Sequence, residues 1–450
     1  MRSIGQVLDR YDGIGPGFHV IRLFLSISVV CWHSVVASYG SDEQALMNPW
    51  SAIPSAILPM FFGLSGFLVM GSALRQRNLK NFIFFRGARM IPALAVEITI
   101  SALLFGAILT TVPLGQYFTS NEFFEYFGSL VGRIRYILPG VFEDNPFPRI
   151  VNISLWTIPG ELLSYSYLAV LMVTGTYLST RAILASAILL GGVFLWADLT
   201  FGAELVGQRM PMQYLLMSYV FGTLIYAARY HIPYGWGAFA LSVVLGLALM
   251  RTVGLGYIGV FFITYAIVFL GMTRIPTAKI FRTGDYSYGI YLYGFPIQQL
   301  MVYLFPGYRE WYWNIAFSLP VVVLIAVFSW HVVEKPALAL RKFVPPTRGL
   351  QLFERGKIQL WLVLWAILSY AYFIAGHSRL YAIGSVTREE KFMVVGLLAL
   401  LAAAIVGLMS LRTNRAARKT GADVASRHDG QDVRDRGIER PGETVPARRS

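Results

Sequence analysis

Twelve apolar windows, each about 20 residues long, recur along this 450-residue chain and limit its fold more than any other feature. A bilayer core about 30 Å thick is crossed by a helix of about 20 predominantly apolar residues. The windows run approximately over 18–38, 52–74, 90–111, 155–175, 182–201, 211–228, 235–250, 254–272, 286–305, 313–333, 358–376 and 392–411. The sequence therefore predicts an all-α, polytopic membrane helix bundle of about 12 transmembrane helices.

The composition excludes a soluble enzyme with a single membrane anchor. Hydrophobic residues make up 56% of the chain and charged residues only 14%, and the mean hydropathy is +0.57. Soluble domains carry about 25% charged residues. The net charge of +14 is spread over short basic clusters between apolar windows, which is typical of membrane topology. We therefore expect membrane lipids as partners and no nucleic acid.

The basic residues also predict the orientation of the chain. With a cytoplasmic N-terminus, the inside connections hold 22 Lys and Arg residues and the outside connections hold nine. Positive residues favour the cytoplasmic side. The sequence thus predicts a multi-pass protein of the inner (plasma) membrane with both termini in the cytoplasm.

Ionisable residues inside an apolar window are functional candidates, because the bilayer disfavours them. Arg22 and His33 share one face of the first helix, and Glu161 is expected at a depth similar to that of His33. A carboxylate beside His33 would orient the imidazole for acid–base or nucleophilic work. The alternatives are a snorkelling Arg22, a packing His33, and a Glu161 that bonds to Tyr165 or to broken backbone. Glu97 is a weaker candidate that can pair with a preceding arginine.

Arg86 and Arg89 lie at i and i+3 near the start of the third window. Guanidinium groups on one helical face suit phosphate binding. The alternative is that these arginines only set the topology.

Two further segments contain candidate substrate-binding residues. Ser65 lies among small and aromatic residues in the segment 61–67, where the alternative role is close helix packing. Tyr288 and Tyr291 lie in a tyrosine-rich segment before Pro296, where the alternative is an interfacial aromatic belt. The six histidines are scattered and Cys31 is the single cysteine, so no metal site is expected.

Taken in order, six motifs resemble the membrane acyltransferase type 3 family over about residues 15–342. The motifs are Arg22 with ten residues before His33, the segment Phe61 to Phe67, Arg86-x-x-Arg89-x-x-Pro92, the segment Ser154 to Glu161 (Ser-Leu-Trp-Thr-Ile-Pro-Gly-Glu), the segment Tyr286 to Gln299, and Val333-Glu334-Lys335-Pro336. The chain departs from the family pattern at Gly160, where a bulkier residue is commoner, and at Gly294, where many relatives have a histidine.

The resemblance implies an integral membrane O-acyltransferase that moves an acyl group, usually acetyl, from cytoplasmic acyl-CoA to a hydroxyl of a cell-surface or lipid-linked glycan. Such glycans include lipopolysaccharide and exopolysaccharide. It also implies that His33 and Glu161 are catalytic. Arg22, Arg86 and Arg89 would bind the acetyl-CoA or other acyl-CoA donor. Direct transfer and a covalent acyl-histidine both remain open.

The runner-up interpretation is a twelve-helix transporter or glycan flippase, but two similar halves are not apparent in the sequence. We expect an acyltransferase domain over 1–342, two additional transmembrane helices over 343–411 and a disordered cytoplasmic tail over 412–450. The acceptor glycan and the oligomeric state are left open by the sequence.

Overall fold

The computed structural model of the chain describes residues 2–11, 13–41, 52–201, 212–250, 252, 254–276 and 284–344. Regular structure in these ranges is helical. Extended backbone pairs there only in two isolated bridges, Ser3 with Pro233 and Ile137 with Ile150. The predicted all-α class is therefore confirmed for the described part of the chain.

Ten of the predicted apolar windows lie in the described ranges, apart from residue 211, and each of them contains a long helix. The ten long helices are α2 (Phe18–Tyr39), α4 (Ala52–Gln76), α5 (Leu79–Thr99), α9 (Ile158–Thr174), α10 (Thr180–Phe201), α11 (Met212–Ala227), α12 (Trp236–Met250), α13 (Gly256–Gly271), α14 (Ser287–Leu304) and α15 (Trp311–Ser329). The windows 358–376 and 392–411 lie outside the described residues, as does the tail at 412–450. The total of about 12 spans stays a prediction.

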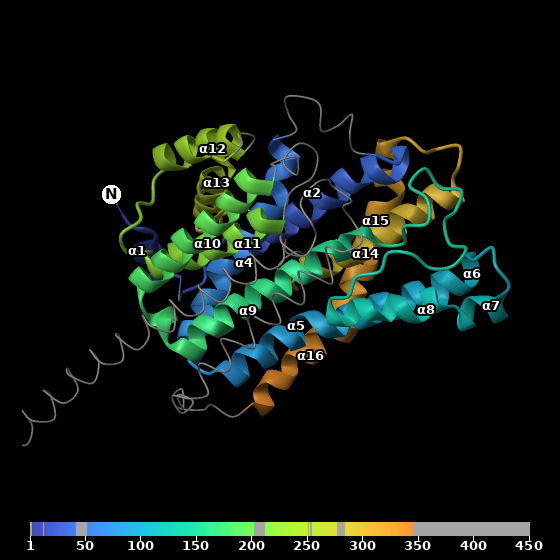
Figure 1. The fold of residues 1–450 in the computed structure, drawn as a ribbon, viewed down its shortest axis with the longest axis horizontal. Coiled ribbons are helices and arrows are strands. Elements are labelled where there is room, and N and C mark those ends of the chain that lie inside the picture. Colours follow the sequence, from blue (N-terminus) through green and yellow to red (C-terminus); the bar gives the residue numbers. More distant parts are fainter. Residues whose placement is uncertain are drawn as a thin grey trace, which may run out of the picture.

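Short helical segments connect or extend the long helices. They are α1 (Ile4–Asp9), α6 (Gly106–Leu109), α7 (Leu114–Thr119), α8 (Asn121–Tyr126) and α16 (Lys335–Ala339), the π-helices η2 (Ile100–Phe105) and η8 (Trp330–Glu334), and the 3₁₀-helices η3 (Phe127–Val131), η4 (Ile153–Thr157), η5 (Thr176–Leu178) and η9 (Leu340–Phe343). The segments α6, α7 and α8 lie at the opposite end of the molecule from α1 (Figure 1).

The third predicted helix begins earlier than its apolar window indicates. The window starts near residue 90, whereas α5 starts at Leu79, where the Asn78 side chain accepts a hydrogen bond from the backbone N–H of Asn81. An asparagine N-cap starts a helix independently of hydropathy. Arg86 and Arg89 consequently lie on a helix rather than in a connecting loop.

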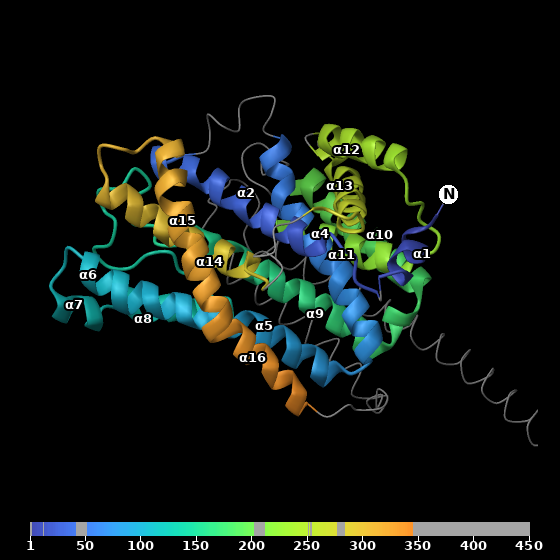
Figure 2. The ribbon, with the colours of Figure 1, turned by 180° about the vertical axis from the view of Figure 1, so that it is seen from behind.

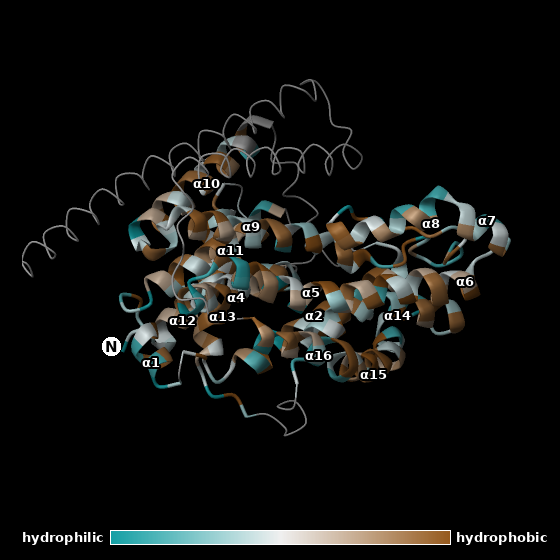
Figure 3. Ribbon diagram, turned by 90° about the horizontal axis from the view of Figure 1, so that it is seen from below, coloured by the Kyte–Doolittle hydropathy of each residue, from teal (hydrophilic) through white to brown (hydrophobic). Residues whose placement is uncertain are grey.

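The outer surface is suited to lipid. Within the described residues, four helical stretches are long and apolar enough to cross a membrane, namely Phe18–Tyr39, Ala52–Gln76, Leu79–Leu109 and Trp311–Phe343. Figure 3 shows hydrophobic residues along α15 and α10, and Leu324, Phe328 and Ile188 on these helices are all at least 65% exposed. Such exposure of large apolar side chains is typical of a surface in contact with lipid. The chain is a membrane protein.

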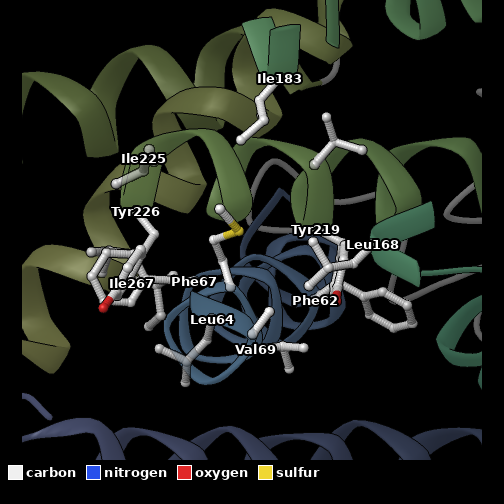
Figure 4. Packing of buried hydrophobic residues seen from close by; sticks show 14 of the residues in the cluster. Phe62, Leu64, Phe67, Val69, Leu168, Ile183, Tyr219, Ile225, Tyr226 and Ile267 are labelled. Atoms are coloured by element: carbon white, nitrogen blue, oxygen red, sulfur yellow. The ribbon is translucent and has the colours of Figure 1, made fainter. Parts of the chain in front are cut away.

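Glycines bring α4 and α11 into backbone contact at the centre of the bundle. A Cβ atom at Gly66 would lie 2.0 Å from the carbonyl oxygen of Tyr219, and one at Gly222 would lie 2.0 Å from that of Gly63. Figure 4 shows the surrounding core, in which Phe67 packs against Tyr226 with ring centroids 5.0 Å apart. The small residues of the segment 61–67 thus have the packing role that the sequence left open.

Buried amides hold α14 between its neighbours. Gln298 Nε2 donates to Val30 O and to Ser34 Oγ on α2, at 2.7 and 2.6 Å. Asn314 of α15 donates from Nδ2 to Gln298 O at 3.1 Å. Beyond α15, η8 leads into α16, which lies beside α5 (Figures 1 and 2). This arrangement places α2, α5, α9 and α14 around one interior.

Candidate active site

Two arginines from different helices share one carboxylate in this interior. Arg22 of α2 donates from Nη1 to Asp285 Oδ2 at 2.5 Å, and Arg89 of α5 donates from Nη2 to the same oxygen at 2.7 Å. Ser287 Oγ donates to Asp285 Oδ1 at 2.7 Å. Burial raises the pKa of Asp285, but the two guanidinium groups lower it by more, so its pKa lies well below the ordinary carboxyl value. The ionised Asp285 therefore joins α2 and α5 to the start of α14.

Arg86 lies one helical turn before Arg89 and is placed by an aromatic ring. Its guanidinium carbon is 5.9 Å from the centre of the Tyr165 ring on α9. Its Nε is buried and has no hydrogen-bond partner in the described part of the chain. The Tyr165 hydroxyl donates to Glu161 Oε1, one turn earlier on α9. An unpaired buried guanidinium nitrogen is costly, which makes Arg86 a candidate for binding an anionic ligand.

Positive charge exceeds negative charge around these residues, which we call the arginine cluster (Arg22, Arg86, Arg89 and Asp285). Arg341 of η9 lies within electrostatic range of Arg86 and Arg89. Arg89 lies within electrostatic range of the carboxyl groups of Asp285 and of Glu334, which is 2% exposed in η8. The cluster therefore fits a ligand with more than one phosphate group.

His33 lies 11 residues after Arg22 on α2, about 16 Å further along the helix axis. Its Nδ1 is 3.5 Å from Ser154 Oγ, and its ring packs edge-on against Phe295 with centroids 5.4 Å apart. Among the described residues, no carboxylate forms an ion pair with this ring. The predicted contact between His33 and Glu161 is thus not seen, and Glu161 bonds instead to Tyr165, the alternative that the sequence left open.

Tyr291 connects the surroundings of His33 to α9. Its hydroxyl donates to Ser154 O at 3.0 Å and lies 2.6 Å from Thr157 Oγ1, while its ring packs 6.2 Å from that of Phe61 on α4. Tyr291 also lies within electrostatic range of Glu161. Tyr291 is therefore close both to Ser154, which contacts His33, and to Glu161.

The other two predicted substrate-binding residues lie apart from His33 in their contacts. Tyr288 donates to Met90 O at 3.1 Å and lies within electrostatic range of Glu161 and Arg89. Ser65 is half-buried in α4, and its hydroxyl makes no hydrogen bond to any residue that the structure describes. Tyr288 therefore belongs with the arginine side, and no hydrogen bond within the described residues ties Ser65 to either side.

A series of polar groups lies between the arginine cluster and His33 in the interior of the bundle. Glu161 of α9 follows Thr157 of η4 by one helical turn. The residues around the arginine cluster and those around His33 therefore meet where η4 joins α9. This polar path runs through the arginine cluster, Tyr165, Glu161, Thr157, Tyr291, Ser154 and His33. Polar groups are costly inside a membrane protein, and their concentration along one path is typical of a functional site.

Comparison with known proteins supplies the family. The family profile described as "Acyltransferase domain" matches residues 16–332, which include every residue of the polar path. The chain belongs to the acyltransferase 3 family. The match confirms the resemblance found in the sequence motifs.

The acyltransferase is also similar to two proteins along most of their length. It is 28% identical to the O-acetyl transferase of Shigella phage Sf6 over 341 residues, which cover 71% of this chain and 94% of that protein. It is 25% identical to nodulation protein 10 of Rhizobium leguminosarum bv. viciae over 370 residues, which cover 75% and 97% of the two chains. No solved structure matches the chain. The family and the phage relative show that the chain is an O-acyltransferase, and they disfavour the transporter interpretation.

Several contact residues of the acyltransferase site were not singled out in the sequence. Asp285 directly precedes the tyrosine-rich segment, and a carboxylate next to an apolar window was the available signal. Ser154 was part of a motif but received no role of its own. Asn152, which bonds to Glu97, precedes that motif by two residues.

Two glycines that depart from the family pattern are explained by close packing. A Cβ atom at Gly160 would lie 2.4 Å from Met212 Sδ of α11, so a bulkier residue beside Glu161 requires Met212 to move. A Cβ atom at Gly294 would lie 2.9 Å from Val30 Cγ2 of α2. Gly294 thus lets α14 lie close to the helix that carries His33.

Proposed function

We propose that this acyltransferase moves an acetyl group from cytoplasmic acetyl-CoA to a hydroxyl of a cell-surface or lipid-linked glycan. The observation that carries the proposal is the polar path, which links a site suited to phosphates with a histidine. The similarity to the O-acetyl transferase of the phage supports acetyl as the acyl group. A glycan acceptor agrees with the family resemblance in the sequence motifs.

The arginine cluster is proposed to hold the phosphates of the donor. Planar guanidinium groups bind phosphate through paired, charge-assisted hydrogen bonds. Arg22 and Arg89 are fixed in place by Asp285, and Arg86 retains an unpaired buried Nε. With the phosphates held there, the thioester end can extend along the path past Tyr165 and Glu161 towards His33.

His33 is proposed to carry out the transfer through Nε2. When Nδ1 carries its proton and donates to Ser154 Oγ, Nε2 has a free electron pair. In direct transfer, Nε2 takes the proton of the acceptor hydroxyl as its oxygen bonds to the acyl carbon. The carbon–sulfur bond breaks, and the proton passes to the thiolate.

The alternative route has two steps. His33 Nε2 bonds to the acyl carbon and the thiolate leaves. The acceptor oxygen then displaces the imidazole, and the acceptor proton passes to the thiolate. Both routes give the same ester and free thiol, so they differ in whether His33 becomes acylated.

The proposed orientation puts both termini and the arginine cluster at the cytoplasmic face of the inner (plasma) membrane, because basic connecting segments favour that side. In this organisation, residues 1–342 form the catalytic domain. The segment 343–411 adds two spans, and 412–450 form a cytoplasmic tail.

Labelled acetyl-CoA tests the proposal in membranes that contain the full chain and a crude glycan fraction. We expect label in the glycan with the wild-type protein and none with His33→Ala at equal expression. Label transfer at the wild-type rate by His33→Ala would contradict the assignment. Mass spectrometry without acceptor separates the routes, because an acetylated His33 peptide indicates the two-step route.

A further inference from the structure

Glu97 of α5 is a buried carboxylate that the proposed chemistry does not use. It is 1% exposed, and its Oε1 accepts hydrogen bonds from Ser101 Oγ and Asn152 Nδ2, both at 2.8 Å. Its Oε2 is buried and has no partner among the described residues, and neither oxygen forms an ion pair with a described arginine. A carboxylate is disfavoured in such a place, so its presence requires a reason.

Asn152 uses every hydrogen-bonding group of its amide except one lone pair of its oxygen. Besides Glu97, Nδ2 donates to Leu292 O at 3.0 Å, and Oδ1 accepts from the backbone N–H of Ser154 at 3.0 Å. Leu292 O lacks its usual helical donor, because the residue four positions later is Pro296, which has no N–H. Rotation of the amide by 180° would turn Oδ1 towards two acceptors. Glu97 and Leu292 O therefore fix the orientation of Asn152.

This orientation determines where Ser154 lies. Asn152 is the N-cap of η4, and its Oδ1 holds the first turn, which contains Ser154. Ser154 presents its hydroxyl to His33 Nδ1 and its carbonyl to Tyr291 and Thr157. A shift of Ser154 would thus alter the contact between its hydroxyl and His33 Nδ1 and also the position of the Tyr291 hydroxyl.

We propose that Glu97 is a positioning residue, which acts through Asn152 and Ser154 to hold the ring of His33 in place for transfer. The inference rests on the proposed function of His33. What Glu97 must supply is a hydrogen-bond acceptor at Oε1. A negative charge is not required, because the groups that hydrogen-bond to this carboxylate within the described part of the chain are the neutral side chains of Ser101 and Asn152.

Two substitutions separate these requirements. Glu97→Gln keeps an acceptor oxygen facing Asn152, and we expect kcat to stay within about threefold of the wild-type value. Glu97→Met has a similar length but no acceptor, and its apolar side chain is favoured inside a membrane helix. We expect Glu97→Met to insert and fold normally and to lower kcat by about tenfold or more, since small displacements at a reacting group have effects of this size. The KM for acetyl-CoA should not change, because Glu97 does not contact the arginine cluster.

A double-mutant cycle tests whether Glu97 acts through Asn152. Asn152→Ala alone should lower kcat as Glu97→Met does, and the double variant should be no slower than the slower single variant. Asn145→Ala is the matched control. Asn145 is a buried asparagine of the same connecting segment, but it bonds to Gln299 and not to Ser154. We expect it to leave kcat unchanged.

Each variant is measured in membranes with labelled acetyl-CoA, at several donor concentrations and normalised to folded protein. A wild-type kcat for Glu97→Met, losses that multiply in the double variant, or an equal loss in Asn145→Ala would overturn the positioning role. A Glu97→Gln protein as slow as Glu97→Met would also overturn it, because the charge would then matter.

His33→Ala distinguishes this failure from that of the proposed function. Full activity of His33→Ala would contradict the proposed function itself. Loss of transfer in His33→Ala together with normal transfer in Glu97→Met would contradict only the positioning role of Glu97.

Discussion

The two ends of the polar path are held by different kinds of interaction. At the arginine cluster, Arg22 and Arg89 form ion pairs of 2.5 and 2.7 Å with a single carboxylate oxygen of Asp285. At the other end, His33 contacts the neutral hydroxyl of Ser154 at 3.5 Å and the edge of Phe295. One end is therefore rich in fixed charge, and the other is not.

This difference corresponds to two separate tasks. Fixed charges bind an anionic ligand, and charges that are already in place need no rearrangement when the ligand binds. A carboxylate beside His33 would favour the imidazolium form, which has no free electron pair, whereas a hydroxyl partner is compatible with the neutral ring. We therefore expect substitutions at the arginine end to change donor affinity and substitutions at the histidine end to change kcat.

The largest effect is expected at His33. His33→Ala removes the imidazole that is proposed to take a proton or carry the acyl group, and kcat should fall by about 10³-fold or more. Binding of acetyl-CoA, measured separately with labelled donor, should be unchanged because the arginine cluster is intact. A parallel loss of donor binding would show that the two ends are not independent.

Glu161 lies between the two ends and tests where the boundary falls. Glu161→Gln should lower kcat by about 10²-fold, because the carboxyl group lies one helical turn from Thr157 and within electrostatic range of Tyr291. The donor KM should change less than threefold. Tyr165→Phe is the control, since it removes the hydroxyl that donates to Glu161 while keeping the ring beside Arg86. A change in KM rather than in kcat would assign Glu161 to the arginine end.

Smaller changes are expected from the arginine pair. Replacing Arg86 and Arg89 together by Gln should raise the KM for acetyl-CoA by about tenfold or more and leave kcat nearly constant, since charge-assisted hydrogen bonds are lost. Replacement by Lys should restore part of the affinity, because the charge returns without the planar fork. Arg135→Gln is the control, as this arginine pairs with Glu125 away from the cluster. An unchanged KM in the double variant would leave these arginines with a role in topology alone.

The sequence predicted the helices well where hydropathy determines them. All ten windows within the described residues are helical, because a segment of about 20 apolar residues has no other stable form in a bilayer. The early start of α5 was missed, since it depends on the Asn78 cap and on basic residues that an apolar window excludes. Hydropathy locates the apolar part of a helix and not its ends.

The candidate site was predicted in part. The ionisable residues Arg22, His33 and Glu161 could be found because a bilayer makes each of them costly, and Arg89 because it is paired with Arg86 at i and i+3. Their partners could not, because a hydrogen bond between Arg22 and Asp285 joins positions 263 residues apart. Glu161 was paired with His33 on estimated depth alone, whereas its neighbour at i+4, Tyr165, is the residue that it bonds.

No effect on activity is expected from the substitution that tests how the two ends are oriented in the membrane. Gln76, the last residue of α4, lies between the basic residues Arg75 and Arg77 and belongs to neither end of the polar path. In a Cys31→Ala background, Gln76→Cys provides a single thiol and leaves every counted charge in place. We expect full transferase activity, with labelling by a membrane-impermeant maleimide only after the cells are opened, because basic segments favour the cytoplasm. Arg86 and Arg89 lie in the first turns of α5, the helix that follows this connection. The arginine cluster would therefore face the compartment that holds acyl-CoA. Labelling from outside intact cells would reverse the orientation and place the charged end on the side without donor, which would contradict the division of tasks between the two ends.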